Sequence, residues 1–523
     1  MLLLSALGAY AQSDYSGDVF RYSDQPITGT ARFQGLGGGH VAIGGDASSA
    51  FTNPAGLGFY NRSEFSLSPG LRLQNVGAQY IDRTTNSSKA VPFVGQAALI
   101  FAGEPSRQGR LRRGTFGITY SRQVNLNNQF TFNAQNNRSS IVDSYAEDLS
   151  RLNVSSSLVN QAFDQSRQTV SNIGANTNSE LPGTAYLAAA YQLYLVDPLN
   201  NNNYQGAEQG RPSLQTQSYS SSGAQSQWTL AYGANFNDKF YIGGGLAFSS
   251  TRFDFTNRYS ETFVGGDQIR GVTDQSTLTV RGSGVNLSLG TIYRPTESVQ
   301  FGATIISPTF SRLTETYNRT LSADIIGIRR TDDNGNPVRF VPDVQRFDLP
   351  SNDFDYSITT PLRASGGATF FFGKRGFLTA TAEYVGYSGM RVGTSAFGSV
   401  ADNQQFRDDN TGFVRSTYQN VVNFRVGGEV RADIFRLRAG AAYLPSAYKA
   451  TFDPLAQSGD RNTLLFSGGA GVRTDRFFAD VAGVFYTNKT AFTPYTLNTP
   501  QNFATATLTN RITNLIASIG FFF

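Results

Sequence analysis

Apolar and polar residues alternate along much of the chain, so that every second side chain belongs to the same class. In the final segment the apolar residues share one parity: Leu515, Ala517, Ile519, Phe521 and Phe523. The other parity holds small and polar residues, with two exceptions. The segment 421–431 repeats the pattern, with Val and Phe opposed to Asn, Arg and Glu. A period of two predicts β-strands with one apolar and one polar face.

Repeats of this alternation predict fourteen strands, near residues 63–74, 91–103, 114–132, 224–237, 240–256, 277–294, 299–318, 355–372, 376–393, 417–432, 434–449, 462–474, 476–490 and 510–523. Turn-forming triplets such as Asn237-Asp238-Lys239 and Gly373-Lys374-Arg375 join several neighbours. Bacterial barrels made from one chain use an even number of strands.

A soluble β-sandwich also alternates, but the pattern recurs too often here for one sandwich. The polar parity carries Arg and Glu beside Gly and Ala, as in a crowded, wet barrel interior. Lipid cannot hydrogen-bond the backbone, so strands cross a bilayer only as a closed cylinder. We therefore predict an all-β transmembrane antiparallel barrel that crosses the outer membrane of a Gram-negative cell. Phe521 and Phe523 would form the terminal aromatic signal that the barrel-assembly machinery reads.

The composition fits this class. The chain has 54 Gly, 41 Phe and 25 Tyr but only 15% charged residues, against about 25% in an average globular protein. The mean hydropathy is −0.28, as expected when only alternate residues meet lipid. A net charge of +5 without any run of Lys or Arg does not favour nucleic-acid binding. The absence of cysteine excludes disulfides and thiolate metal sites.

The N-terminus predicts export. Leu2 to Ala9 are mostly apolar and lead to Ala9-Tyr10-Ala11, the A-x-A pattern of a signal-peptidase site. We expect residues 1–11 to be a signal peptide, truncated because no positive segment precedes the apolar one; an apolar first strand is the alternative. No stretch approaches the roughly 20 apolar residues that a membrane helix needs.

Residues 12–62 precede the first strand and are rich in Gly and Ala. Such a segment could project outward or fold into the lumen as a plug. The run Gly35-Leu36-Gly37-Gly38-Gly39 has no strand before it and no Lys-Ser or Lys-Thr after it, so it satisfies neither nucleotide-binding fingerprint. Close backbone packing inside a barrel is the better interpretation of these glycines.

Residues 63–523 would form the barrel, interrupted at 138–197 by an insertion. Ile141, Tyr145, Leu149 and Leu152 recur there at helical spacing, so we expect a mainly helical insertion on the outer face. The stretch 185–196 could be an extra strand, but fifteen strands would break the even count. Residues 327–350 and 397–415 are expected to be polar loops. The run 332–336 has oxygen ligands but lacks the spacing of a calcium loop, so a turn is expected.

No catalytic constellation is present. The one histidine, His40, lies before the barrel and has no serine at a spacing that supports nucleophilic catalysis. One histidine also excludes histidine-cluster metal sites. Glu383 and Glu429 are better explained by pairing with luminal arginines such as Arg425. We expect no enzyme activity, no metal and no cofactor.

Three motifs resemble the hatch of the long-chain fatty-acid transporter family of outer-membrane proteins, the FadL and TodX type. They are Gln34-Gly35-Leu36-Gly37-Gly38-Gly39, Gly44-Gly45-Asp46-Ala47 and Asn53-Pro54-Ala55-Gly56-Leu57. The resemblance implies a fourteen-stranded barrel plugged by a hatch at residues 12–62. It further implies a route for hydrophobic molecules into an internal pocket and out sideways near a kinked third strand, where the Asn and Gln at 125–129 would host the kink. On this resemblance the gating residues are Gly35, Gly37, Gly38, Asn53, Pro54 and Ala55.

The resemblance favours passive transport of hydrophobic compounds, with long-chain fatty acids as the default ligand and lipids of the outer membrane as surroundings. The alternative is an accessory barrel that serves as a binding platform in a protein secretion system. A water-filled porin is a third interpretation, which a plugged lumen would oppose. The insertion and long loops depart from the family pattern, so no ligand residues are assigned.

Overall fold

The structure of the chain is a computed structural model that describes residues 15–24, 27–106, 110–153, 185–200, 202–332, 335–349 and 351–523. The expected signal peptide at 1–11, most of the insertion (154–184) and part of the run 332–336 lie outside the described residues.

The strands form a closed antiparallel barrel of 14 strands. β1 (Glu64–Tyr80) pairs with β2 (Arg83–Ala102) on one side and with the last strand, β23 (Ala506–Phe522), on the other, which closes the cylinder. Around the wall from β2 follow β3 (Leu111–Asn125) with β4 (Asn128–Asn136), β7 (Ser213–Phe236), β8 (Phe240–Phe263), β9 (Ile269–Tyr293), β10 (Val299–Ile306) with β11 (Phe310–Ile325), β15 (Asn352–Thr359) with β16 (Arg363–Phe371), β17 (Gly376–Val385) with β18 (Arg391–Thr394), β19 (Val421–Ala432), β20 (Phe435–Leu444), β21 (Thr463–Arg473) and β22 (Phe477–Phe492). The predicted strand number is confirmed.

The apolar parity faces outward. In β23, Phe521 is 55% exposed whereas Ser518 is 0% exposed, and in β20 Leu437 is 63% exposed. A folded protein in water rarely displays alternate large apolar side chains all around its surface. In a barrel wall these side chains are the lipid contact, and the buried parity faces the lumen. The alternation that predicted the strands therefore also predicted their faces.

Four predicted strands are broken, and the stretch 114–132 is divided into β3 and β4. The stretch 299–318 is interrupted between β10 and β11 at Pro308, and 355–372 between β15 and β16 at Pro361. A proline has no N–H to donate to the ladder, so it ends the pairing on one side. Thr309 and Thr360 bond across the two breaks, with the Thr360 N–H donating to the Thr309 carbonyl at 3.1 Å. A 3₁₀ turn (Tyr387–Gly389) separates β17 from β18.

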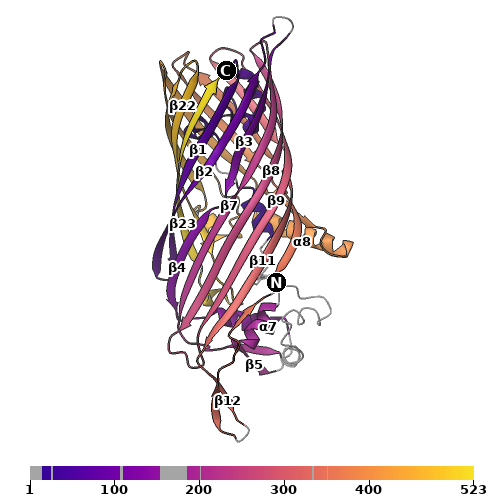
Figure 1. Cartoon of the computed structure of the whole chain (residues 1–523), viewed down its shortest axis with the longest axis vertical. Coiled ribbons are helices and arrows are strands. Elements are labelled where there is room, and N and C mark those ends of the chain that lie inside the picture. The colour runs from indigo at the N-terminus through magenta and orange to yellow at the C-terminus, as the bar shows by residue number, and fades with distance from the viewer. Residues whose placement is uncertain are drawn as a thin grey trace.

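Tight turns occupy one end of the barrel and long excursions the other (Figure 1). Asn237 and Asp238 both have positive φ, 54° and 56°, in the turn from β7 to β8, as a type I′ hairpin requires. Short turns mark the periplasmic end of outer-membrane barrels, and longer loops mark the extracellular end. The C-terminus lies at the end with the short turns, and the excursions with α7, β5 and β12 lie at the other.

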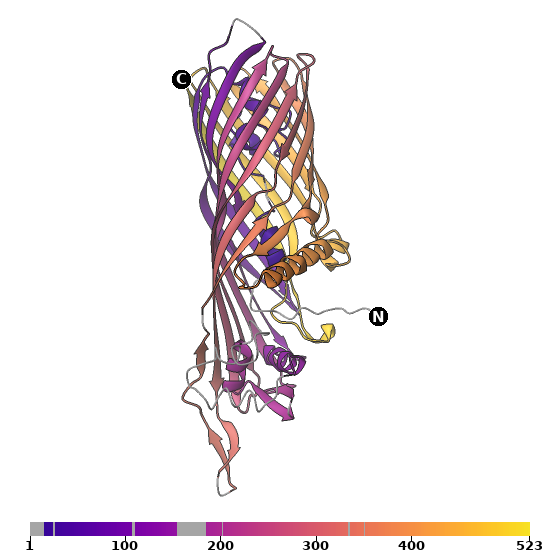
Figure 2. The ribbon, with the colours of Figure 1, turned by 90° about the vertical axis from the view of Figure 1, so that its right-hand side faces the viewer.

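The described part of the insertion contains α4 (Ile141–Arg151) and α7 (Ala185–Gln192), followed by the hairpin β5 (Val196–Asn200) and β6 (Asn203–Gly206). Its helices pack on the extended ends of β8, β9 and β11. The prediction of a polar loop at 397–415 is wrong, because this stretch forms α8 (Val400–Thr417). This helix projects from the side of the barrel (Figures 1 and 2). The loop expected at 327–350 contains the short strands β12 (Ile328–Thr331), β13 (Pro337–Phe340) and β14 (Arg346–Asp348).

The remaining short helices are α9 (Pro454–Gln457), a 3₁₀ turn (Pro500–Asn502) and those of the N-terminal segment: α1 (Tyr15–Arg21), α2 (Ala31–Gly35), α3 (Ser49–Thr52) and the 3₁₀ helix η1 (Pro54–Phe59). Among the helices in the described part of the chain, none is long and apolar enough to cross a membrane. Residues 15–24 and 27–60, named here the luminal segment, lie within the cylinder of strands (Figure 2).

Candidate transport site

The luminal segment is organised around one buried carboxylate. Thr30 caps α2 by accepting a hydrogen bond from the Phe33 N–H at 3.1 Å. Its own hydroxyl donates to the carboxylate of Asp46 at 2.9 Å, and the Ser48 N–H donates to the same carboxylate at 2.9 Å. Although burial alone would raise it, the positive charge of Arg32 and these hydrogen bonds hold the pKa of Asp46 below its usual value. The motif Gly44-Gly45-Asp46-Ala47 thus ties the segment together.

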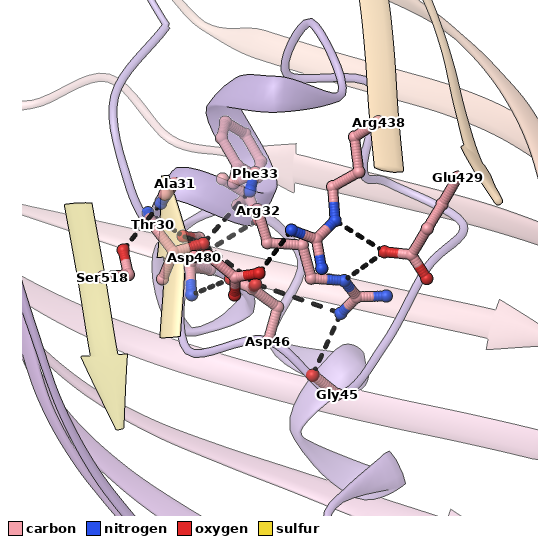
Figure 3. Close-up of polar contacts among 12 residues, drawn as sticks. Thr30, Ala31, Arg32, Phe33, Gly45, Asp46, Glu429, Arg438, Asp480 and Ser518 are labelled. Carbon is pink, nitrogen blue, oxygen red and sulfur yellow. Dashed lines mark hydrogen bonds and ion pairs between the residues drawn. The ribbon is translucent and has the colours of Figure 1, made fainter. Parts of the chain in front are cut away.

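Arg32 joins the group of residues hydrogen-bonded to Asp46 to the barrel wall (Figure 3). Its Nε lies 3.3 Å from Oε2 of Glu429 in β19, and its Nη1 donates to the Gly45 carbonyl at 3.1 Å. Arg438 of β20 reaches the same Glu429 oxygen at 2.7 Å and also pairs with Asp480 of β22. All these side chains are nearly inaccessible to water, and burial of unpaired charge is costly. The cluster therefore fixes α2 to three wall strands.

A second buried cluster lies around Glu383 of β17. Its carboxylate is 3.3 Å from Nη1 of Arg363 and 3.0 Å from Nη1 of Arg425. Arg363 in turn donates to the carbonyl of Ser23 in the luminal segment at 2.6 Å. The structure thus places Glu383 and Glu429 in ion pairs with luminal arginines, Arg425 among them, as the sequence predicted.

The Asn53-Pro54-Ala55 element rests on a row of wall glycines. The Asn53 amide donates to the carbonyls of Val41 at 2.6 Å and Thr291 at 3.2 Å, and its oxygen accepts from the Ala55 N–H. A Cβ at Gly243 of β8 would lie 2.3 Å from the Pro54 carbonyl carbon. Similar collisions would arise at Gly233 and Gly290 on the neighbouring strands. Because these wall residues are glycines and have no side chain, the Asn53-Pro54-Ala55 element can approach the backbone of the wall strands closely.

The nominated glycines Gly35, Gly37 and Gly38 lie at and after the end of α2. Gly37 and Gly38 have positive φ, 68° and 74°, which L side chains rarely adopt. Gly37 packs on the backbone of Ala441, and the wall glycines Gly427 and Gly440 receive the neighbouring chain. These wall glycines were not predicted as contacts of the luminal segment, although runs such as Gly243-Gly244-Gly245 mark such positions in the sequence.

His40 is buried, and neither of its ring nitrogens has a hydrogen-bond partner among the described residues. Its ring packs edge-on against Phe33 at 5.3 Å between centroids. Burial lowers the pKa of His40 to about 4, so the neutral imidazole is the form that fits this site. Across the described residues, no group of three or more His, Cys, Asp or Glu could hold a metal ion.

Two adjoining cavities lie in the outer half of the lumen. The outer cavity, of about 620 Å³, lies between the insertion and the extended wall strands, and six tyrosines line it: Tyr145, Tyr186, Tyr219, Tyr259, Tyr317 and Tyr495. The central cavity, of about 420 Å³, lies beside α1. Gly17, Arg21 and Tyr219 border both. Volumes of this size suit small organic ligands.

The wall is incompletely hydrogen-bonded beside the central cavity. The ladder between β2 and β3 joins Gln96–Ala102 to Thr115–Ser121 and ends there. Over the described residues Arg83–Gly95, β2 forms no ladder with the third wall strand, which is itself interrupted between Asn125 and Asn128. The interruption lies in the Asn- and Gln-rich stretch where the kink was expected. We name this stretch, residues 83–95 facing 122–127, the wall gap.

The C-terminal residues complete the wall. Phe521 is exposed on the lipid face and pairs in register with Phe65 of β1. Phe523 follows the strand, and its N–H donates to the Ser63 carbonyl at 3.0 Å.

No family model and no curated protein matches the sequence. Solved structures match its fold. A FadL homologue from Pseudomonas aeruginosa aligns with a TM-score of 0.55 over 95% of this chain and 99% of its own, at 14% identity. A deltaS2 mutant of the TodX monoaromatic hydrocarbon channel aligns with a TM-score of 0.50 over 94% of this chain and 98% of its own, at 13% identity. The chain therefore has the FadL and TodX fold, that of a multi-pass β-barrel of the outer membrane.

Proposed function

We propose that this protein transports hydrophobic compounds passively through the outer membrane, with long-chain fatty acids as the default substrate. The ligand enters the outer cavity, passes α1 into the central cavity and leaves through the wall gap into the membrane. The observation that carries the proposal is the position of the central cavity, which Val124, Asn125, Leu126 and Asn127 of the wall gap line directly.

Sideways release has a physical reason. An alkyl chain loses about 0.8 kcal/mol for each CH₂ group that returns to water. A route through the wall delivers such a chain from an internal cavity to lipid without crossing the aqueous periplasm. The wall can open at the gap more easily than elsewhere, because no backbone ladder has to break there.

A disulfide between β2 and β4, beside the wall gap, tests sideways release. The hydroxyl oxygens of Ser87 in β2 and Thr131 in β4 are 3.3 Å apart, and the chain has no cysteine of its own. Ser87→Cys with Thr131→Cys would tie β2 to β4 and prevent the gap from widening. We expect oxidation to lower fatty-acid uptake by cells that lack their own transporter, and reduction to restore it.

The matched control joins two strands elsewhere in the wall. The hydroxyl oxygens of Thr369 in β16 and Thr379 in β17 are 2.9 Å apart, so Thr369→Cys with Thr379→Cys makes a comparable bridge. Its oxidation should leave uptake unchanged. Equal uptake by the oxidised and reduced gap variant would contradict release through the wall.

Movement of the luminal segment is tested separately. A Cβ at Gly35 would lie 3.6 Å from the Cβ of Ala482 in β22, within the range of about 3.5–4.5 Å seen in disulfides. Gly35→Cys with Ala482→Cys therefore staples the segment to the wall. Uptake that falls on oxidation supports gating by the segment, and deletion of residues 53–55 should alter uptake while leaving a folded barrel. Unchanged uptake in both variants would refute the gating role.

A further inference from the structure

One row of outward-facing side chains marks the outer edge of the lipid belt on the long strands. β7, β8, β9 and β11 lie side by side in the wall (Figure 1), and their register aligns the exposed residues Trp228, Phe248, Val285 and Phe310. Beyond this row, towards the long excursions, the outward positions are polar or small. Aromatic girdles lie at the membrane interfaces of such barrels. We name these four residues the rim row.

Three arginines occupy the next outward positions beyond the rim row. Arg312 of β11 follows Phe310 by two residues, so it has the same outward parity. Arg252 of β8 and Arg281 of β9 lie directly opposite each other, one position farther out. Arg281 pairs with Thr314, which places Arg312 on its diagonal. Opposite side chains are about 5 Å apart and diagonal ones about 7–8 Å, so the three guanidinium groups can reach one head group.

The nearby carboxylates leave positive charge in excess beside the lipid. Arg281 and Arg252 share one partner, Asp254, at 2.7 and 3.6 Å. Arg312 is exposed and forms no ion pair with the described residues.

The acidic residues of this face lie level with the arginines or farther from the lipid. Asp355 pairs with Thr314 and accepts a hydrogen bond from its hydroxyl. Asp254 and Asp353 lie one outward position farther from the rim row. Among the outward-facing charges of these strands, the arginines are therefore the ones nearest to the hydrocarbon boundary.

Basic side chains at this level attract anionic lipid head groups, and the planar guanidinium fork matches the oxygens of a phosphate. Ser250 and Ser283 stand opposite each other between the rim row and the arginines, and both are exposed. Their hydroxyls can hydrogen-bond the sugar of a glycolipid.

We propose that Arg252, Arg281 and Arg312 form a binding site on the outside of the barrel for the phosphate of the glycolipid that makes up the outer leaflet. The acyl chains of this lipid lie along the rim row. The site faces the membrane rather than the lumen, so it goes beyond the transport proposal and does not depend on it.

The chain carries its own reporter for this site. Trp228 is the only tryptophan of the sequence, and it lies in the rim row beside Phe248. Arg252 is four residues beyond Phe248, about 13 Å along the strand. The acyl chains of a lipid whose phosphate lies at Arg252 therefore pass Trp228.

Displacement of a quenching lipid measures the binding. The full chain is reconstituted into vesicles of dibrominated phosphatidylcholine, whose bromine atoms quench the fluorescence of Trp228. Purified lipid A, the phosphorylated glycolipid, is then added in increasing proportion. We expect lipid A to relieve the quenching at a lower proportion than unlabelled phosphatidylcholine does. Lipid A without its phosphates should behave as phosphatidylcholine does.

Substitutions identify the residues that bind. We expect Arg252→Gln, Arg281→Gln and Arg312→Gln each to lower the preference for lipid A over phosphatidylcholine by about fivefold, and the triple variant to abolish it. Arg511→Gln is the matched control, because Arg511 is exposed on the outer face of β23, between Asn75 and Thr487. It should change nothing. Unheated electrophoresis verifies that each variant is a folded barrel.

Three results would overturn the proposal. The first is equal displacement by lipid A in wild type and in the folded triple variant. The second is equal displacement by lipid A with and without its phosphates, since the contact would then be with sugar or acyl chains alone. The third is release of lipid A by inorganic phosphate beyond the effect of sodium chloride at the same ionic strength, which would indicate a site for the free ion.

Discussion

Replacing Gly243 with alanine should loosen the Asn53-Pro54-Ala55 element from the barrel wall. The added Cβ would lie 2.3 Å from the Pro54 carbonyl carbon and 2.5 Å from the Ala55 nitrogen. These are backbone atoms that cannot rotate away, so the element must shift. Overpacking of this kind costs about 1–3 kcal/mol. At 1.4 kcal/mol for each tenfold change, local opening would become about 5- to 150-fold more frequent.

Gly244, the next residue of β8, is the matched control. A Cβ there would have its nearest contact 3.5 Å from Cδ2 of Leu289, an ordinary packing distance. Gly244→Ala therefore changes the strand by the same methyl group on the opposite face without touching the luminal segment. Any gain from lower backbone freedom is shared by both variants.

Thiol labelling measures the opening. Ser49 is buried in α3, its hydroxyl has no hydrogen-bond partner among the described residues, and the chain has no native cysteine. Ser49→Cys thus supplies one thiol whose reaction with a maleimide reports exposure of the segment. We expect labelling to accelerate in Gly243→Ala and to stay unchanged in Gly244→Ala. Equal rates in the two variants would refute the steric argument.

The remaining predictions concern four other residues. Asn53→Ala removes three hydrogen bonds and should cost about 1–3 kcal/mol, measured by the same labelling. Glu429→Gln removes the carboxylate that pairs with the buried Arg32 and Arg438 and should cost about 3–5 kcal/mol in urea unfolding. The loss should be less than additive when Arg32→Gln is added, and additive losses would show that the pair does not interact. The pKa of His40 is about 4 in the folded protein, against an ordinary value of 6.5. Its contribution to the free energy of unfolding, about 3 kcal/mol, is therefore complete above pH 6.5 and is lost as the pH falls towards 4. His40→Gln should make the stability less dependent on pH in this range, and an equally steep dependence would exclude this residue as its cause. Phe523→Ala should slow barrel assembly in cells, seen as more unfolded band in unheated electrophoresis, and normal assembly would remove its signal role.

The lipid-facing part of each strand could be predicted from the sequence because lipid and lumen impose opposite polarity on alternate residues. The same reason explains the errors. β7 begins at Ser213, but its first residues, such as Gln215 and Ser218, carry no apolar parity, so the predicted strand began at 224. Outside the bilayer no lipid selects for an apolar outer face, so the alternation weakens. α8 was missed because it is largely exposed and shows little apolar periodicity.

The candidate site was predictable only in part. The luminal motifs drew attention to Asn53 and the glycines by resemblance. The contact of Arg32 with Glu429 joins residues almost 400 positions apart, which no local pattern specifies. Such partners follow from the register of the closed wall.

Unequal strand lengths give the barrel a slanted outer edge. β7, β8 and β9 have 24, 24 and 25 residues, whereas β19, β20 and β21 have 12, 10 and 11. Since about 9–11 residues suffice to cross a bilayer, more than half of each long strand stands above the lipid, and the short strands end near its surface. A molecule that diffuses among the outermost lipid head groups therefore meets a tall part of the wall on one side of the barrel. On the other side it meets a low part of the wall, next to α8. Arrival at the protein should depend on the direction of approach within the plane of the membrane.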